Sequence, residues 1–143
     1  MPDASPDPFM LQRFVDAQDP VYAQVTAELA AGAKTSHWMW FVFPQLKALG
    51  RSATALHYGL VSRVEAQAYW RHPLLGLRLA ECSTLVLNAH GLSALQIFGS
   101  IDAMKLCSCM TLFEAVAPEA AVFAQVIDRF YAGQRDPLTL ALL

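Results

Sequence analysis

Charge is scarce in this sequence. Only 15% of its 143 residues are charged, against roughly 25% in average soluble domains. The net charge is −2, and the ten lysines and arginines are scattered singly along the chain. A surface that follows nucleic-acid phosphates needs clustered cations, so we expect no nucleic-acid partner.

Long apolar runs are also missing. The longest uninterrupted one extends from Trp38 to Pro44, far short of the roughly 20 residues that a membrane-crossing helix needs. We therefore expect no membrane partner. Residues 1–8 contain neither the basic nor the apolar region of a signal peptide. We expect them to form a disordered tail ahead of a single domain, residues 9–143.

Cysteines are few and do not have the spacing of a disulfide framework. Cys82, Cys107 and Cys109 are odd in number, which favours a reduced, cytoplasmic protein. Residues 107 and 109 would point to different sides of a helix, and a closed zinc site needs four ligands. The glycine-rich cofactor fingerprint, the phosphate loop and the paired histidines of zinc proteases are absent too. We expect neither a metal nor a cofactor.

What the chain does have is apolar content with helical periodicity. Hydrophobic residues make up 55% of the sequence, enough for one sizeable core at this length. Asp19-Pro20 and Ser62 mark helix starts, while Gly32 and Pro118 mark helix ends. The pattern predicts an all-α fold, a compact single-domain orthogonal bundle of about seven helices, with residues 38–43 at its centre.

One segment, residues 34–46, holds two of the three tryptophans and two of the eight phenylalanines. So many large rings are too costly to leave in water. Three polar side chains are set among them: Lys34, His37 and Gln45. They are either hydrogen-bonded structural fixtures or the wall of a site, and the sequence does not distinguish the two.

His37 stands beside Trp38 and close to Trp40. A histidine in such surroundings is suited to proton transfer or to donating to a ligand oxygen. It is equally suited to a structural bond with a backbone carbonyl. The tryptophans are likewise either a stacking platform for a ligand or part of the core.

A second polar pattern consists of Asp102, Lys105, Ser108 and Thr111, at steps of three. On a helix, such steps produce a drifting stripe. A lysine held by an aspartate and flanked by hydroxyls could grip a phosphate or a carboxylate. The alternative is an ordinary surface ion pair worth a fraction of a kcal/mol.

Two segments resemble the signature of DUF1810, a bacterial family of unknown function. They are His37-Trp38-Met39-Trp40-Phe41-Val42-Phe43-Pro44-Gln45-Leu46 and Lys105-Leu106-Cys107-Ser108-Cys109-Met110-Thr111-Leu112-Phe113. Shorter pieces at residues 11–18, 72–76 and 97–99 support the resemblance, which extends from residue 9 to the C-terminus. It implies a mainly helical single domain and no particular activity. Some members carry a calpastatin label, but calpastatin repeats are disordered and polar, unlike this apolar chain. Cys109 departs from the serine expected in the motif.

The resemblance also implies that the two polar groups belong together. Our leading hypothesis is a pocket for an anionic, partly planar ligand, a nucleotide or a sugar phosphate. His37 is the catalytic candidate, although the sequence does not establish that a reaction occurs. The alternative is a non-enzymatic protein-interaction module, a monomer or weak homodimer docking through the helix at residues 119–132. The proposed ligand-binding residues are Lys34, Trp38, Trp40, Gln45, Asp102, Lys105, Ser108 and Thr111.

Overall fold

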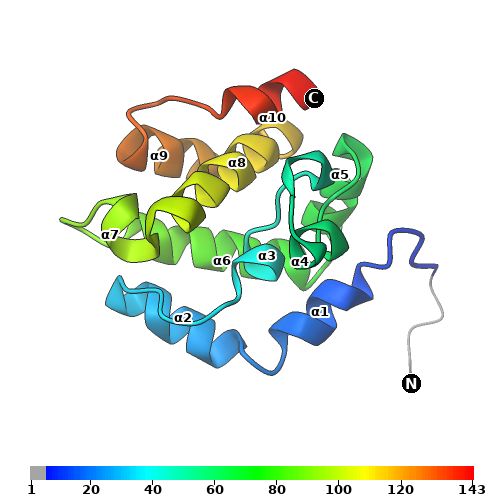
Figure 1. The fold of residues 1–143 in the computed structure, drawn as a ribbon, viewed down its shortest axis with the longest axis horizontal. Coiled ribbons are helices and arrows are strands. Elements are labelled where there is room, and N and C mark those ends of the chain that lie inside the picture. The colour runs from blue at the N-terminus through cyan, green and yellow to red at the C-terminus, as the bar shows by residue number, and fades with distance from the viewer. Residues whose placement is uncertain (1–5) are drawn as a thin grey trace.

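The computed structural model describes residues 6–143 and has the all-α fold that the sequence predicts (Figure 1). This range contains ten α-helices, one 3-10 helix and no β-strand beyond an isolated bridge between Leu46 and Leu60. The predicted number, about seven, was too low because several helices are single turns, too short to show a period. The helices are α1 (Gln12–Gln18), α2 (Tyr22–Ala31), α3 (Met39–Val42), η1 (Lys47–Leu49), α4 (Ala53–His57), α5 (Arg63–Arg71), α6 (Leu75–Leu87), α7 (Ala94–Phe98), α8 (Ser100–Val116), α9 (Ala121–Phe130) and α10 (Pro137–Leu142).

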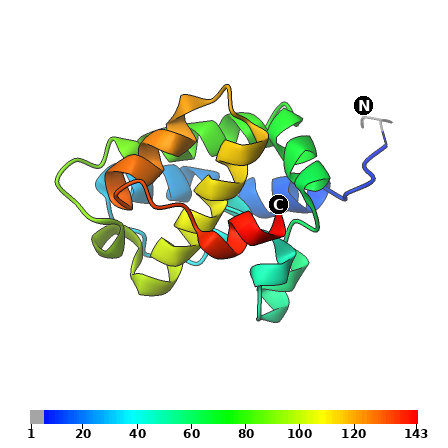
Figure 2. The same cartoon turned by 90° about the horizontal axis from the view of Figure 1, so that it is seen from above.

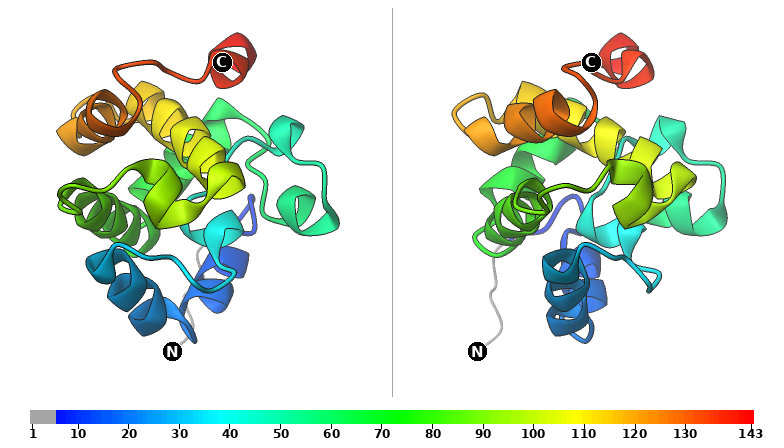
Figure 3. Two further views of the ribbon diagram at one scale, coloured as in Figure 1. Left: turned by 60° about the vertical axis from the view of Figure 1, so that its left-hand side comes forward. Right: turned by 90° about the vertical axis from the view of Figure 1, so that its left-hand side faces the viewer.

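Helix α6 crosses the middle of the molecule, with α1 and α2 on one side and α8, α9 and α10 on the other (Figure 1). Helix α8 packs against α5, α7, α9 and α10, and the short α3 packs against α1 and α6. Figure 2 shows η1 and α4 projecting from this body, and Figure 3 shows α3 close to the beginning of α8. Within residues 6–143, no helix combines the length and the apolarity needed to cross a membrane.

The aromatic segment lies inside the fold. Trp38 and Phe43 are each 1% exposed, and they flank α3 on either side. Their ring centroids are 6.1 Å apart, and the Phe43 ring also meets that of Phe98 edge to face at 6.2 Å. Because α3 is only one turn long, its position depends on these buried rings rather than on its own helical hydrogen bonds.

The tail predicted for residues 1–8 falls partly outside the described residues, since residues 1–5 are not among them. Asp7 is described, and its carboxylate accepts hydrogen bonds from the backbone N–H groups of Leu11 at 2.7 Å and Gln12 at 2.9 Å. These bonds satisfy N–H groups that a helix start leaves free. The chain directly ahead of α1 is thereby tied to the helix.

Helix α9 has a strongly amphipathic sequence, and its apolar face is used internally. Phe123, Val126 and Ile127 are fully buried, and α9 packs against α6 and α8. The large exposed hydrophobic side chains of residues 6–143 lie on other elements. This helix therefore does not supply the open apolar docking face suggested for the interaction-module alternative.

Candidate functional site

A cavity of about 460 Å³ opens where the loop before α3 meets the start of α8. It brings together five of the predicted site residues, although they come from segments far apart in the sequence. The others that line it are mainly apolar or belong to the first turn of α8. The full lining is Lys34, His37, Met39, Trp40, Phe98, Gly99, Ser100, Ile101, Asp102 and Lys105.

The loop that forms one wall is held by Glu28, a residue that the sequence analysis did not select. One carboxylate oxygen of Glu28 accepts from the backbone N–H groups of Thr35 at 2.8 Å and Ser36 at 3.0 Å, and from Trp38 Nε1 at 3.0 Å. The other accepts from Ser36 Oγ at 2.6 Å and Gln24 Nε2 at 2.7 Å. Five hydrogen bonds therefore converge on one buried carboxylate.

This network determines the charge of Glu28. Burial by itself raises the pKa of the carboxyl, but hydrogen bonds from Ser36, Gln24 and two backbone N–H groups outweigh it and hold the pKa well below its usual range. The group is therefore ionised at neutral pH. A lone glutamate directly before the apolar run Leu29-Ala30-Ala31 was the available sequence signal, because an acid that is buried with its helix needs nearby donors.

Lys34 lies at the end of this loop and is fully engaged by the protein. Its ammonium is 2.8 Å from Asp102 Oδ2, donates to the Ser36 carbonyl at 2.6 Å and lies 5.0 Å from the centre of the Trp38 ring. Its backbone N–H donates to the Ile97 carbonyl at 2.9 Å. The Lys34 side chain is only 6% exposed. Its main role is therefore to attach the loop to α8, and little of its charge is accessible to a ligand.

Lys105 is held far more loosely. Its ammonium is 4.0 Å from Asp102 Oδ1 and 5.2 Å from the centre of the Trp40 ring. It makes no hydrogen bond to any of residues 6–143. An ammonium has three N–H donors, so Lys105 has donors to offer to a ligand in the cavity.

The predicted site residues His37, Trp38 and Trp40 differ in how far they are exposed to the cavity. His37 is exposed, lines the cavity and forms no hydrogen bond within the described part of the chain. Trp40 is half-buried and also lines the cavity. Trp38 is buried beneath Lys34, with its indole N–H donating to Glu28. Only Trp40 of the two tryptophans has a surface that a ligand could contact.

Ser108 and Thr111 are not brought to the cavity. Ser108 Oγ donates to Asp136 Oδ2 at 2.9 Å, and Thr111 Oγ1 accepts from the Asp136 backbone N–H at 3.0 Å. Each step of three falls about 60° behind a full turn of helix, so Thr111 lies on the opposite side of α8 from Asp102. Both hydroxyls attach α10 to α8 instead.

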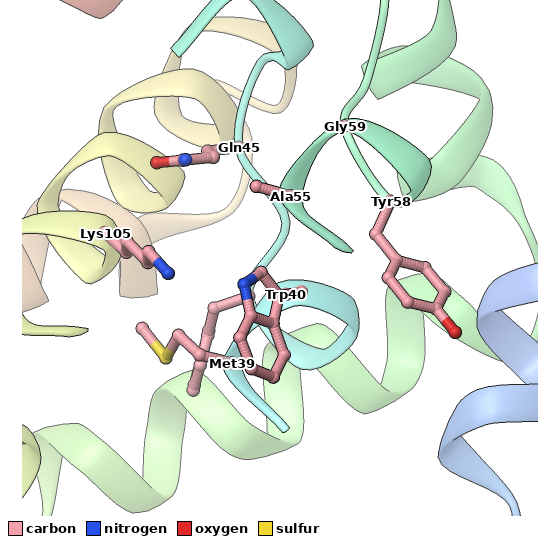
Figure 4. A pocket seen from close by; sticks show the side chains of 8 residues that line it. Met39, Trp40, Gln45, Ala55, Tyr58, Gly59 and Lys105 are labelled. Carbon is pink, nitrogen blue, oxygen red and sulfur yellow. The ribbon is translucent and has the colours of Figure 1, made fainter. Parts of the chain in front are cut away.

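Gln45 lines a second, much smaller cavity behind Trp40, which we call the niche. Its volume of about 10 Å³ is enough for one water molecule. Trp40, Met39 and Lys105 line both the niche and the larger cavity. The amide of Gln45 makes no hydrogen bond to any of residues 6–143. Figure 4 shows the niche, whose lining is Met39, Trp40, Phe43, Gln45, Ala55, Tyr58, Gly59 and Lys105.

Among residues 6–143 there is no group of three or more histidine, cysteine or acidic side chains placed to hold a metal ion. The three cysteines are free, and Cys82 and Cys109 are buried. Burial raises the pKa of the Cys82 thiol to about 12 and that of Cys109 well above its usual value. These two thiols are therefore poor nucleophiles.

Comparisons with known proteins identify relatives but no activity. A family model described as "Protein of unknown function (DUF1810)" matches residues 8–143. The crystal structure of the conserved hypothetical protein Rv1873 from Mycobacterium tuberculosis is similar, with 52% sequence identity and a TM-score of 0.94. That match covers 96% of this chain and 98% of the other. None of the curated proteins matches this chain.

Proposed function

We propose that this chain, which belongs to the DUF1810 family, binds a small anionic ligand in the cavity at the start of α8. The ligand class is a nucleotide or a sugar phosphate. The family description and the mycobacterial relative name no function, so the proposal depends on the charges and shape of the cavity itself.

The observation that carries the proposal is the unequal use of the two lysines. Lys34 and Asp102 form a close ion pair at 2.8 Å, and their opposite charges balance. Lys105 then leaves one uncompensated positive charge in the cavity wall, with free N–H donors. A charged hydrogen bond to a phosphate or carboxylate is stronger than a neutral one, so an anion is the favoured ligand.

The start of α8 adds to this field. Its first turn, including Ser100 and Ile101, lines the cavity, and no side chain caps its N–H groups. The N-terminal end of a helix carries a partial positive charge of roughly half a unit. It therefore acts in the same direction as Lys105.

The size and walls of the cavity support a ligand larger than an inorganic ion. Small-molecule sites typically measure roughly 300–1,000 Å³, and this cavity of about 460 Å³ lies in that range. Met39, Trp40 and Phe98 provide apolar surface beside the cationic group. In the proposal, Trp40 contacts the flatter part of the ligand and Lys105 its anionic part.

A catalytic role is a further part of the proposal and depends on His37. Its imidazole lines the cavity with no hydrogen bond to residues 6–143, so both ring nitrogens are available. Histidine is the side chain best suited to proton transfer near neutral pH. Binding requires Lys105, whereas a reaction would require His37 as well.

A thermal-shift screen against nucleotides and sugar phosphates tests the proposal. A ligand stabilises the folded state by RT ln(1 + [L]/Kd), about 2.7 kcal/mol at 100 times Kd. We expect the ligand to raise the melting temperature of the wild type, and we expect Lys105→Met to abolish that rise. His37→Ala should keep the rise if His37 acts only in catalysis. Lys47→Met, an exposed lysine outside both cavities, is the matched control. A shift that Lys105→Met preserves, or no shift at all, contradicts the proposal.

One observation favours the protein-interaction module as a second candidate. Leu95, Ile101 and Met104 are 61%, 69% and 72% exposed on the consecutive, mutually packed helices α7 and α8, and Ile101 also lines the cavity. Exposed apolar groups beside a cavity are typical of contact surfaces. If this candidate is right, sedimentation equilibrium detects a salt-insensitive dimer that Ile101→Ser with Met104→Ser dissociates.

A further inference from the structure

The niche and the larger cavity are separated by side chains rather than by backbone. Trp40 and Lys105 line both spaces, and the Lys105 ammonium lies over the Trp40 ring at 5.2 Å. Together with Met39, which also lines both spaces, this pair therefore forms the partition between the two. In Figure 4 the ends of Lys105 and Gln45 lie on the same side of Trp40.

The far wall of the niche is rigid. A Cβ atom added to Gly59 would lie 2.5 Å from the Cα of Lys47, so the backbone there is already in close contact. Phe43 is 1% exposed and belongs to the core. Gly59 and Phe43 therefore leave no room for a ligand group on their sides of the niche.

The partition is the weakly held side. Lys105 has no hydrogen bond to residues 6–143 and only a 4.0 Å contact with Asp102. A cation over an aromatic ring at a partly exposed site is held only weakly. A charged hydrogen bond is stronger, so an anion that forms one with Lys105 is sufficient to draw it away from Trp40.

Gln45 supplies the chemical character of the niche. Its amide has two donors and an acceptor, it is half-buried, and it forms no hydrogen bond to any of residues 6–143. Its amide atoms themselves are not buried, so both its donors and its acceptor are available to a ligand. A hydroxyl group, which both donates and accepts, matches an amide in this respect.

We propose that the niche is the inner half of the binding site and that the ligand is a sugar phosphate rather than a nucleotide. When Lys105 moves onto the phosphate, the niche opens and Gln45 hydrogen-bonds a sugar hydroxyl. A nucleobase is disfavoured because the niche, at about 10 Å³, fits a hydroxyl group, which is close in size to a water molecule, and not a planar ring. This inference rests on the proposed function, since it requires an anion at Lys105.

The test uses isothermal titration with inorganic phosphate, ribose 5-phosphate and adenosine 5′-monophosphate. We expect ribose 5-phosphate to bind about twofold to tenfold more tightly than phosphate, the contribution of a neutral hydrogen bond. In Gln45→Leu this advantage should disappear while the phosphate affinity is kept. Gln125→Leu, an exposed glutamine on α9 that lines neither cavity, should behave as the wild type.

The outcomes separate the inference from the proposed function. In one outcome, Lys105→Met abolishes binding, but ribose 5-phosphate and phosphate bind with equal affinity both to the wild type and to Gln45→Leu. The proposed function then stands, and the niche is not a subsite. Tighter binding of adenosine 5′-monophosphate than of ribose 5-phosphate overturns the assignment to sugar phosphates. If none of the three compounds binds the wild type, both proposals are overturned.

A spectroscopic measurement follows the partition directly. The fluorescence of Trp40 is obtained by subtracting the emission spectrum of Trp40→Phe from that of the wild type. Movement of Lys105 away from the ring should change the intensity or wavelength of that emission when ribose 5-phosphate binds, because a charge leaves the indole. If binding leaves the Trp40 emission unchanged, the partition does not open.

Discussion

The Lys34 ammonium lies 2.8 Å from the Asp102 carboxylate, joining the loop before α3 to the first turn of α8. Close to this contact, the Lys34 backbone N–H donates to Ile97 at 2.9 Å. The ion pair neutralises Asp102, which would otherwise repel an anion from the cavity. The charge that remains belongs to Lys105. This division of roles between two lysines leads to the first of four predictions.

Replacing each lysine with methionine should separate structure from binding. Lys34→Met removes a buried ion pair and a hydrogen bond to Ser36, so we expect the free energy of unfolding to fall by about 1–3 kcal/mol. Lys105→Met loses only weak contacts and should cost about 0.5 kcal/mol. Urea denaturation of both variants measures the difference. Equal losses would show that Lys105 is as structural as Lys34.

Glu28→Ala should be among the most destabilising substitutions on the loop. It leaves Trp38 Nε1 and the backbone N–H groups of Thr35 and Ser36 without their acceptor, so we expect a loss of about 3–5 kcal/mol. Asp16→Asn, an exposed acid whose side chain accepts from Gln12, is the control and should change stability by less than about 0.5 kcal/mol. A similar small effect for Glu28→Ala would mean that the loop does not depend on this network.

The same carboxylate should make stability fall at acid pH. Hydrogen bonds hold the folded-state pKa of Glu28 below the unfolded value, which is about 4.3. The resulting stabilisation is complete above the unfolded pKa and declines as the pH falls below about 4.3 towards the folded pKa. We expect the unfolding free energy of Glu28→Gln to depend less steeply on pH between about 4.5 and 2 than that of the wild type. Parallel curves would remove Glu28 as the cause.

Gly76→Ala should destabilise the junction of α5 and α6. A Cβ atom at this position would lie 2.0 Å from the carbonyl oxygen of Trp70, so the two helices would have to separate. We expect a loss of about 1–3 kcal/mol, typical of overpacking. Helix propensity alone predicts the opposite, a gain of up to about 1 kcal/mol. Thermal unfolding of the variant therefore distinguishes overpacking, which lowers the melting temperature, from helix propensity, which raises it.

Much of the fold could be predicted because periodicity and helix ends are local properties. Gly32, for example, ends α2 in the left-handed conformation, as its position after an apolar helix indicates. Ser62 and Glu65 have the spacing of a capping box, which forms only in part: Ser62 Oγ accepts from the Glu65 backbone N–H, but the Glu65 carboxylate accepts from Val61 and Arg13 instead. A complete capping box occurs at Ser93 instead. Tertiary partners, which a local motif does not contain, decide between these outcomes.

The candidate site was harder to predict, because it depends on distant contacts. Spacing placed Asp102 and Lys105 together correctly, but three-residue steps drift around a helix, and so Ser108 fell on another face. Trp38 and Trp40 are indistinguishable in the sequence, yet one is buried and the other lines the cavity. Glu28 was missed because four of the five hydrogen bonds that it accepts come from a loop with no regular pattern.

The Lys34–Asp102 pair also connects the proposed binding site with the order in which the chain can fold. One wall of the cavity comes from the first third of the chain and the other from α8, so no local fragment contains both. Contacts of such long sequence separation form only after the intervening chain has been ordered. A nascent or C-terminally truncated chain that lacks α8 should therefore have no affinity for the proposed ligand, and binding would report that the chain has been made and folded at least through α8.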